Sequence, residues 1–167
     1  LEPSDSQEAK DFVAIGLDIS EQFDTPVMLR TTTRISHSKS LVDLKARQEV
    51  PLKPYQKNVA KYFVVPANQR PKRPLIEKRL EHLAMFADTF PGNRVEGTGK
   101  ECAIIANGTG YLYAKEALGD RATYLKLGLT WPLPATLIRE FVAQHGKVYV
   151  IEEGEPFLEE QIKALGI

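Results

Sequence analysis

Residues 102–110, which read CAIIANGTG, decide the fold of this chain. The first five are consecutively apolar, as is typical of a parallel strand that is covered on both faces. Gly108 and Gly110 then open a helix that the pattern predicts to run through Leu118. A strand that leads through a glycine turn into a helix indicates the start of an α/β repeat.

The same alternation continues to the end of the chain. Strands are predicted at 123–127 and 147–151, and helices at 134–142 and 156–165, each helix beginning at a proline. Because parallel strands are joined by crossover helices, this order predicts a small parallel sheet of the Rossmann-like kind with right-handed connections. The fold class predicted from the sequence is therefore α/β.

The N-terminal part of the chain predicts half of another repeat. Asp5 and Glu8 have the spacing of a capping box ahead of an amphipathic helix at 6–22. Pro26 ends this helix because it lacks a backbone donor. The apolar and β-branched residues 27–33 then predict a short strand.

The middle of the chain reads as a connector. Five of the eleven prolines fall within residues 47–74, which excludes a long helix there, and the apolar run at 62–65 predicts only a short extended piece. We expect this part to cross a surface without forming a second core. A helix is predicted from Leu75 to just before Pro91, followed by a turn at 93–100.

The composition excludes several classes of protein. The 167 residues carry 22 Lys and Arg against 22 Asp and Glu, so there is no electrostatic basis for general binding to nucleic acid or to a membrane surface. No apolar run approaches the roughly 18–20 residues of a membrane span. The single Cys102 excludes an intrachain disulfide or a metal site built from cysteines of this segment, and it favours a reducing, cytoplasmic setting.

The start of the chain predicts that it belongs to something longer. It opens at Leu1, without an initiator methionine or the features of a signal peptide, and almost inside a helix start. We therefore expect one domain, or two small pieces of a larger polypeptide.

Three residues are candidates for binding a carboxylate. Arg30, Arg34 and His37 lie at or just past the carboxyl end of the strand predicted at 27–33. Ligands of parallel sheets gather at that end, and guanidinium groups suit a carboxylate substrate. The alternative is an exposed strand end with solvated arginines, which are common on protein surfaces.

Two further motifs follow predicted strands. The turn at 107–110 could hold an anion on backbone amides, but it lacks the third glycine of a dinucleotide fingerprint and the Lys-Ser/Thr of a P-loop, so we favour a purely conformational role. Glu152 and Glu153 could bind a metal as a carboxylate pair. We favour capping of the last helix, because acidic groups stabilise a helix N-terminus. The residues by themselves thus offer no nucleophile–base pair and no metal cluster.

Motifs along the whole chain resemble those of one enzyme family. They comprise residues 2–9 (EPSDSQEA), 23–30 (FDTPVMLR), 32–38 (TTRISHS), 127–134 (LGLTWPLP), 149–153 (YVIEE) and 156–161 (PFLEEQ). Their order and spacing are similar to those of the thiamine-diphosphate-dependent 2-oxoacid:ferredoxin oxidoreductases, in particular the large subunit of the indolepyruvate type. The likeness is weakest across residues 47–75.

The resemblance implies a function and a domain plan. Residues 1–46 would be the end of a pyrimidine-binding domain, 47–99 a proline-rich connector and helix, and 100–167 a transketolase C-terminal-like domain. The whole enzyme would oxidatively decarboxylate aryl 2-oxoacids such as indolepyruvate, transferring the acyl group to coenzyme A and electrons to ferredoxin. Thiamine diphosphate with Mg would carry the carbanion chemistry and [4Fe-4S] clusters the electrons, and the partners would include a small beta subunit.

The resemblance also implies what this segment lacks. The family's cofactor-activating glutamate would lie before Leu1, and its diphosphate–magnesium motif and cluster cysteines after Ile167. We therefore predict no catalytic, cofactor-binding or metal-binding residue here, and at most Arg34 and His37 near the substrate. The alternative is a stand-alone nucleotide- or acyl-group-binding α/β module that uses the turn at 107–110.

Overall fold

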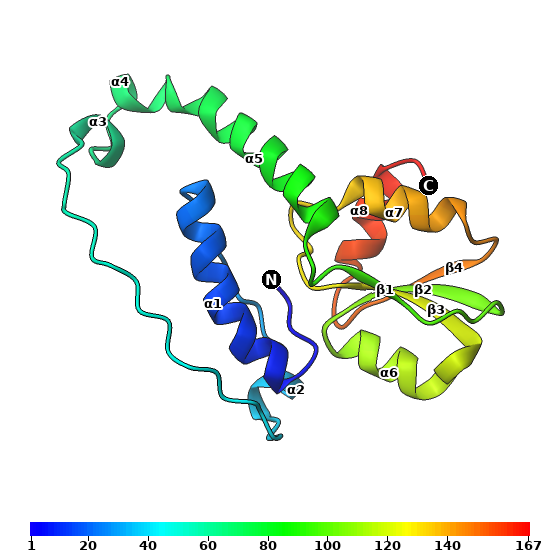
Figure 1. Cartoon of the computed structure of the whole chain (residues 1–167). Coiled ribbons are helices and arrows are strands. Elements are labelled where there is room, and N and C mark those ends of the chain that lie inside the picture. The colour runs from blue at the N-terminus through cyan, green and yellow to red at the C-terminus, as the bar shows by residue number, and fades with distance from the viewer.

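A computed structural model describes all residues, 1–167 (Figure 1). Its centre is a four-stranded sheet with the order β1-β3-β2-β4. The strands are β1 (Arg94–Glu96), β2 (Cys102–Asn107), β3 (Ala122–Leu127) and β4 (Val148–Ile151). Strands β3 and β4 pair with β2 in parallel, which confirms the predicted α/β class, whereas β1 pairs with β3 in antiparallel orientation.

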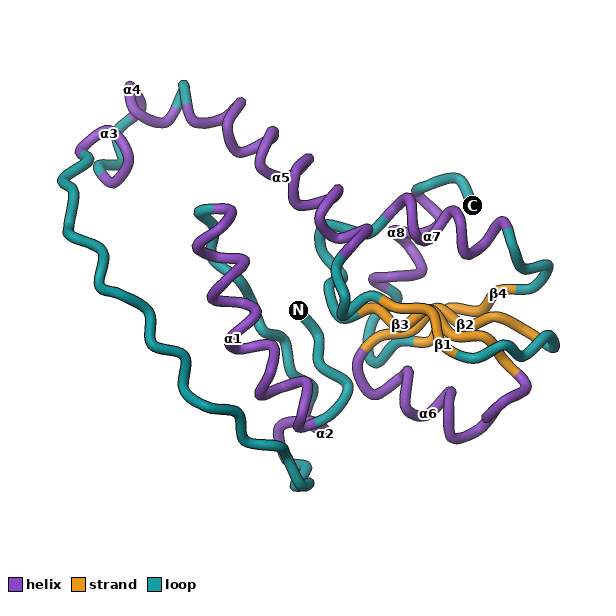
Figure 2. Tube along the Cα trace, in the orientation of Figure 1, coloured by secondary structure: helices purple, strands orange, loops and turns teal.

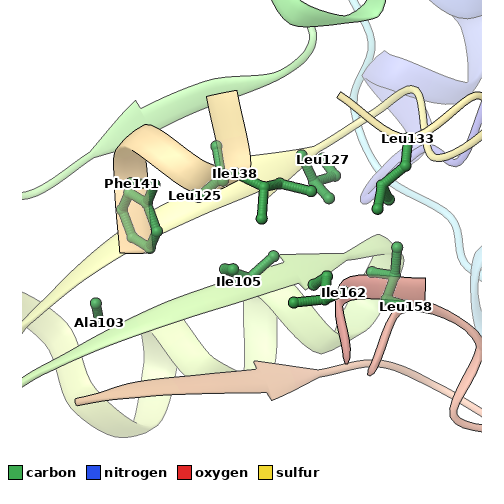
Figure 3. Close-up of a cluster of buried hydrophobic side chains, with 9 residues drawn as sticks. All are labelled: Ala103, Ile105, Leu125, Leu127, Leu133, Ile138, Phe141, Leu158 and Ile162. Carbon is green, nitrogen blue, oxygen red and sulfur yellow. The ribbon is translucent and has the colours of Figure 1, made fainter. Parts of the chain in front are cut away.

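Helices cover both faces of the sheet (Figure 2). They are α6 (Gly108–Leu118) on one face, and α7 (Ala135–Ala143) and α8 (Phe157–Ala164) on the other. Successive residues of a strand point to opposite faces, so the apolar run of β2 contributes to two cores. Ile104 packs with Tyr111 of α6, whereas Ile105 packs with Ile138 and Leu158 of the other layer (Figure 3).

The strand β1 corrects the prediction of a plain turn at 93–100. It has only three residues, and Val95 in its centre is half exposed. A segment this short shows no readable periodicity, and pairing with the edge of β3 is what makes it a strand. The sheet therefore has four strands and is mixed, whereas the sequence predicted three parallel strands.

The N-terminal helix α1 (Ser6–Phe23) and the long helix α5 (Lys72–Thr89) share a second core. Its buried members are Phe12, Ile19, Leu83, Ala87, Phe90 and Leu129. Leu129 follows β3, so this core joins residues from all three predicted parts of the chain. Asp5 caps α1 as predicted by accepting a hydrogen bond from the Glu8 amide, but the Glu8 carboxylate reaches the amide of Ser4 and not that of Asp5.

The strand predicted at 27–33 is wrong. Residues 27–32 belong to no strand, and Thr33–His37 form the short helix α2. This segment pairs instead with the N-terminal residue, because the amide of Arg30 donates a hydrogen bond to the carbonyl of Leu1. β-Branched residues favour extended backbone, but a strand also needs a neighbouring strand to pair with.

The connector contains more helix than predicted. The short helices α3 (Val59–Tyr62) and α4 (Pro66–Gln69) interrupt it, and α3 takes Tyr62 out of the extended piece predicted at 62–65. Helix α5 begins at Lys72, before Pro74, because the first turn of a helix tolerates a residue without a backbone donor. A 3-10 turn, η1 (Gly119–Arg121), links α6 to β3. None of the helices is both long and apolar enough to cross a membrane.

Candidate functional site

The candidate site lies at the carboxyl edge of the parallel strands. Strands β2, β3 and β4 end there at Asn107, Leu127 and Ile151; α6 follows β2 directly, and loops follow β3 and β4. Such an edge is where open α/β sheets bind ligands. In this chain the edge is covered by residues 1–4 and approached by residues 25–37.

A buried carboxylate organises this edge. Glu2 is 7% exposed, and its Oε2 accepts hydrogen bonds from Asn107 Nδ2 at 2.6 Å and Arg30 Nη1 at 3.0 Å. Its Oε1 accepts a hydrogen bond from Thr130 Oγ1 at 2.8 Å. One side chain thereby ties the N-terminal segment to the ends of two strands, and a buried charge of this kind is tolerated because its oxygens are bonded.

Backbone bonds fix the same segment. The Glu2 amide donates to the Gly128 carbonyl at 2.7 Å, directly after β3. Asn93 orders that turn, because its Oδ1 accepts from the amides of Gly128 and Leu129 at 2.8 Å. Arg30 therefore lies at this edge through its pairing with Leu1 and Glu2, whereas the strand at whose end the sequence placed it does not form.

The glycine turn at 107–110 has a conformational explanation. Gly108 has a φ of +48°, and a Cβ at Gly110 would lie 2.9 Å from the carbonyl oxygen of Ile151. The backbone conformation therefore favours glycine at position 108, and the close approach of Ile151 favours it at position 110. The Glu2 carboxylate bonds to the side chain of Asn107, the residue before the helix, and Gly108, Thr109 and Gly110 are buried. The Asn107 Oδ1 atom is buried without a hydrogen-bond partner.

Of the two predicted substrate-binding residues, one lies close to this edge. Arg34, on α2, is exposed; its Nε lies 3.8 Å from Glu153 Oε1 and its guanidinium 5.4 Å from the centre of the Tyr113 ring. Glu153 in turn accepts a hydrogen bond from Thr109 at the start of α6. His37 ends α2 and is exposed, and its side chain forms no hydrogen bond or ion pair. Their binding of a substrate stays a prediction.

The two glutamates after β4 have separate roles. Glu152 accepts hydrogen bonds from the amides of Leu158 and Glu159, at 2.8 and 3.1 Å. These amides lie in the first turn of α8, which confirms the predicted capping. Glu153 points instead toward Thr109 and Arg34, so the pair does not act together.

A pocket opens beside the Glu2 network. Its volume is about 600 Å³, and nine of its sixteen lining residues are hydrophobic. Apolar residues of α1 and α5 form one side, and Leu129 and Trp131 form the other. Trp131 packs edge-on against Phe157 with ring centres 6.3 Å apart, while Glu2, Arg30 and Glu155 supply the charged side chains of the lining. The arrangement suits a molecule or side chain with an aromatic or aliphatic body.

A second charged network fastens α1 to the sheet. Lys126 of β3 has a fully buried side chain, and its Nζ donates to Glu8 Oε2 at 2.6 Å. Arg94 Nη1 donates to the other oxygen of Glu8 at 3.1 Å. Burial lowers the pKa of Lys126, an effect that Glu8 offsets only in part. For Glu8, burial alone would raise the pKa, but Lys126 and Arg94 outweigh it and hold the pKa below its ordinary value.

The network continues through β1. Glu96 accepts hydrogen bonds from Arg94 Nε, Lys115 Nζ and Tyr111 Oη, each at 2.6 Å. Burial alone would raise the pKa of Glu96, but these three donors lower it to about 2. Charged hydrogen bonds thus connect α1, the edge strand β1 and α6 in one chain of contacts.

Sequence reasoning missed both networks. For Lys126 a signal existed, because a lysine inside an apolar strand that is covered on both faces must be buried and needs a carboxylate. For Glu2 no such signal existed, since Asn107 and Thr130 are more than a hundred positions away in the chain.

The residues present do not fit the cofactors that the resemblance implies. No three His, Cys, Asp or Glu side chains gather so that they could hold a metal ion. A [4Fe-4S] cluster needs four cysteine ligands, and Cys102 is the only cysteine. Groups for thiamine diphosphate with Mg, or for such clusters, would have to come from other polypeptide.

Comparisons with known proteins give one consistent result. No protein-family model matches the chain. It is 41% identical, over 98% of its length, to indolepyruvate oxidoreductase subunit IorA of Pyrococcus horikoshii, and 36% identical over all of it to the IorA subunit of Archaeoglobus fulgidus. The IorA subunit of Methanothermobacter thermautotrophicus is 36% identical over 99%. The chain spans 27–28% of the length of these relatives.

A solved structure is also similar. It is a 2-oxoglutarate:ferredoxin oxidoreductase from Magnetococcus marinus with 2-oxoglutarate, coenzyme A and succinyl-CoA bound. The match covers 60% of this chain and 18% of that chain, with 25% identity and a TM-score of 0.42, which is too low to establish a shared arrangement.

Proposed function

The chain is related over its whole length to a segment of the IorA subunits of indolepyruvate oxidoreductase, and we propose that it works as part of such an enzyme. The activity is that of a 2-oxoacid:ferredoxin oxidoreductase, which oxidatively decarboxylates an aryl 2-oxoacid such as indolepyruvate. The acyl group passes to coenzyme A and the electrons to ferredoxin. The observation that carries this proposal is 36–41% identity along 98–100% of the chain.

The segment serves as a platform within that enzyme. The Glu2 network and the Glu8–Lys126 pair join the N-terminal segment to the sheet, and this fixes where the following residues 25–37 emerge. Thiamine diphosphate, Mg and [4Fe-4S] clusters are held by other parts of the enzyme, and a small beta subunit completes it. Residues 1–46 act as the end of a pyrimidine-binding domain and 100–167 as a transketolase C-terminal-like domain. The enzyme works in the cytoplasm, in keeping with a single unpaired cysteine.

Arg34 is the residue here that we assign to the substrate carboxylate, with His37 beside it. The Arg34 side chain is 64% exposed and its ion pair with Glu153 is long, at 3.8 Å, so the guanidinium is free to take another carboxylate. In the complete enzyme, Arg34→Ala should raise the KM for indolepyruvate about tenfold while kcat changes little, because a lost charged hydrogen bond weakens binding by about 1.5 kcal/mol.

Arg121→Ala is the matched control for that experiment. Arg121 is similarly exposed and makes an equally long ion pair, 3.8 Å to Glu101, but it precedes β3 at the opposite edge of the sheet. Its replacement should leave the KM unchanged. Equal KM values for Arg34→Ala and the unmodified enzyme would remove Arg34 from the site, and the same test on His37→Ala decides its role.

The activity itself is tested on the complete subunit together with its small partner subunit. We expect reduction of ferredoxin that requires both indolepyruvate and coenzyme A. Absence of that reaction, combined with tight binding of an adenine nucleotide at the turn 107–110, would instead favour the stand-alone binding module. The burial of Gly108, Thr109 and Gly110 argues against the module, because a nucleotide phosphate could reach their backbone amides only by displacing the residues that cover them.

A further inference from the structure

The positive charge of this neutral chain is concentrated in one segment. Residues 38–79, which we call the basic arm, contain eleven Lys and Arg against three Asp and Glu, a net charge of +8. The rest of the chain is correspondingly acidic. Figure 1 shows that most of the arm runs apart from the sheet, leaving α2 and returning through α3 and α4 into α5.

Ion pairs tie the arm to α1. Lys45, Lys53 and Lys61 recur every eight residues and pair with carboxylates of α1 and its C-cap residue, namely Asp11 at 3.1 Å, Glu21 at 2.5 Å and Asp24 at 2.5 Å. The lysine side chains in these pairs are 40–75% exposed, and exposed pairs contribute little to stability. Between residues 39 and 57, one backbone amide, that of Asp43, finds a partner in the body.

The arm's large apolar side chains are not covered. Leu41 is 100% exposed, Leu52 99%, Leu44 86% and Tyr55 84%. Scattered exposed apolar residues are ordinary, but a series of them along one extended segment marks an interaction surface. Lys39, Lys57, Arg70 and Lys78 add charges that form no ion pair.

We propose that the basic arm docks onto an acidic protein surface that carries apolar side chains between its carboxylates. The arm's own contacts show this preference, because its lysines select the carboxylates of α1, a helix that also exposes Val13 and Leu17. The unpaired cations of the arm attract and orient an acidic partner. The exposed leucines and tyrosine become buried when that partner covers them, which adds apolar contact area to the interface.

Two features favour protein over the other polyanions. The aliphatic residues Leu41, Leu44 and Leu52 offer nothing to a phosphate backbone, and Asp43 and Glu49 would repel it. Pro51 and Pro54 prevent the amphipathic helix with which basic segments bind an anionic membrane. An acidic protein surface satisfies both the charges and the apolar side chains.

The test is a titration with a defined acidic polypeptide. The complete subunit that contains this chain is added to a fluorescently labelled random copolymer of glutamate and tyrosine, and binding is followed by anisotropy at low ionic strength. We expect tighter binding to this copolymer than to polyglutamate. The triple variant Lys57→Glu, Arg70→Glu, Lys78→Glu should weaken binding about tenfold, since three exposed charge contacts are lost.

Matched controls separate the arm from general charge. The triple variant Lys100→Glu, Lys147→Glu, Lys163→Glu makes the same change in net charge on the sheet domain and should shift the affinity less than about twofold. The variant Leu52→Ser, Tyr55→Ser should bind both polymers equally, because it removes apolar contacts without changing charge. All substituted side chains are surface-exposed, and circular dichroism checks that each variant is folded.

Four results would overturn the proposal. The first two are equal weakening by both triple variants and no preference for the tyrosine-containing copolymer. The third is tighter binding to single-stranded oligothymidylate or to phosphatidylglycerol vesicles than to the copolymer. The fourth is protection of residues 41–57 from trypsin in the complete subunit before any polymer is added, which would show that the arm is already covered.

Discussion

Helix α1 makes ion pairs on two sides, and they differ in their surroundings. At its first turn, Glu8 meets Lys126, whose side chain is fully buried. Along its outer side, Glu21 meets Lys53, and both partners are at least 70% exposed. The two pairs have nearly the same length, 2.6 and 2.5 Å. The comparison teaches that burial, and not distance, decides how strongly an ion pair holds a segment in place.

The difference divides the molecule into a fixed part and a detachable part. Residues 1–4 and α1 are held to the sheet by buried charges, by backbone hydrogen bonds and by the core around Phe12 and Leu129. The part of the basic arm that precedes α5, residues 38–71, begins directly after α2 and is held to α1 by solvated lysines. We therefore expect the basic arm to separate from α1 with only a small loss of free energy.

The largest effect is expected from Glu8→Ala. It should lower the free energy of unfolding by about 3–5 kcal/mol, because Lys126 would remain buried beside Arg94 without a carboxylate. Urea denaturation of the variant measures this. The double variant Glu8→Leu, Lys126→Met should recover most of the loss, since it removes both charges; a single variant as stable as the unmodified protein would refute the buried role of the pair.

A smaller loss is expected from Glu2→Ala. It should lower the free energy of unfolding by about 1–3 kcal/mol, because the buried side chains of Asn107 and Thr130 lose their shared acceptor. Thermal unfolding followed by circular dichroism provides the measurement. If the melting temperature did not change, the N-terminal segment would not be anchored at this edge.

Acid should loosen the fixed part in a defined range. The pKa of Glu96 is depressed from 4.5 to about 2, so the stability that its ionised form contributes is complete above pH 4.5 and is lost as the pH falls toward 2. Glu96→Gln should therefore lower the free energy of unfolding by about 1 kcal/mol at neutral pH and make its decline with acid shallower. Urea titrations at several pH values test this, and parallel pH curves for the two proteins would contradict it.

The smallest effect is expected from Glu21→Ala. It is the same kind of substitution on the same helix as Glu8→Ala, but the pair that it removes is exposed. The free energy of unfolding should fall by about 0.5 kcal/mol or less, and added salt should abolish the difference. A loss as large as that of Glu8→Ala would mean that the arm is as firmly held as the N-terminal segment.

The elements with strong patterns were predictable from the sequence. The strands around Ile105, Leu125 and Val150 and the helices between them are confirmed, because long apolar runs and glycine or proline boundaries depend only on local residues. The capping role of Glu152 is confirmed for the same reason, since its partners in α8 are only six and seven positions away.

What depended on distant partners was not predictable. Strand β1 exists because β3 offers it an edge, and residues 27–33 fail to form a strand because no strand lies beside them. Within the candidate site, the predicted Arg34 lies near the sheet edge, but the organising residue Glu2 was missed because its partners come from three separate parts of the chain.

Amide hydrogen exchange measured residue by residue tests the division into a fixed and a detachable part most directly. We expect the amides of α1 around Phe12 and Ile19 to exchange as slowly as those of β2, since one cooperative unit contains both. Amides at 44–57 should exchange at rates close to those of an unfolded peptide. Exchange of α1 as fast as that of the arm, or of the arm as slow as that of α1, would contradict the account.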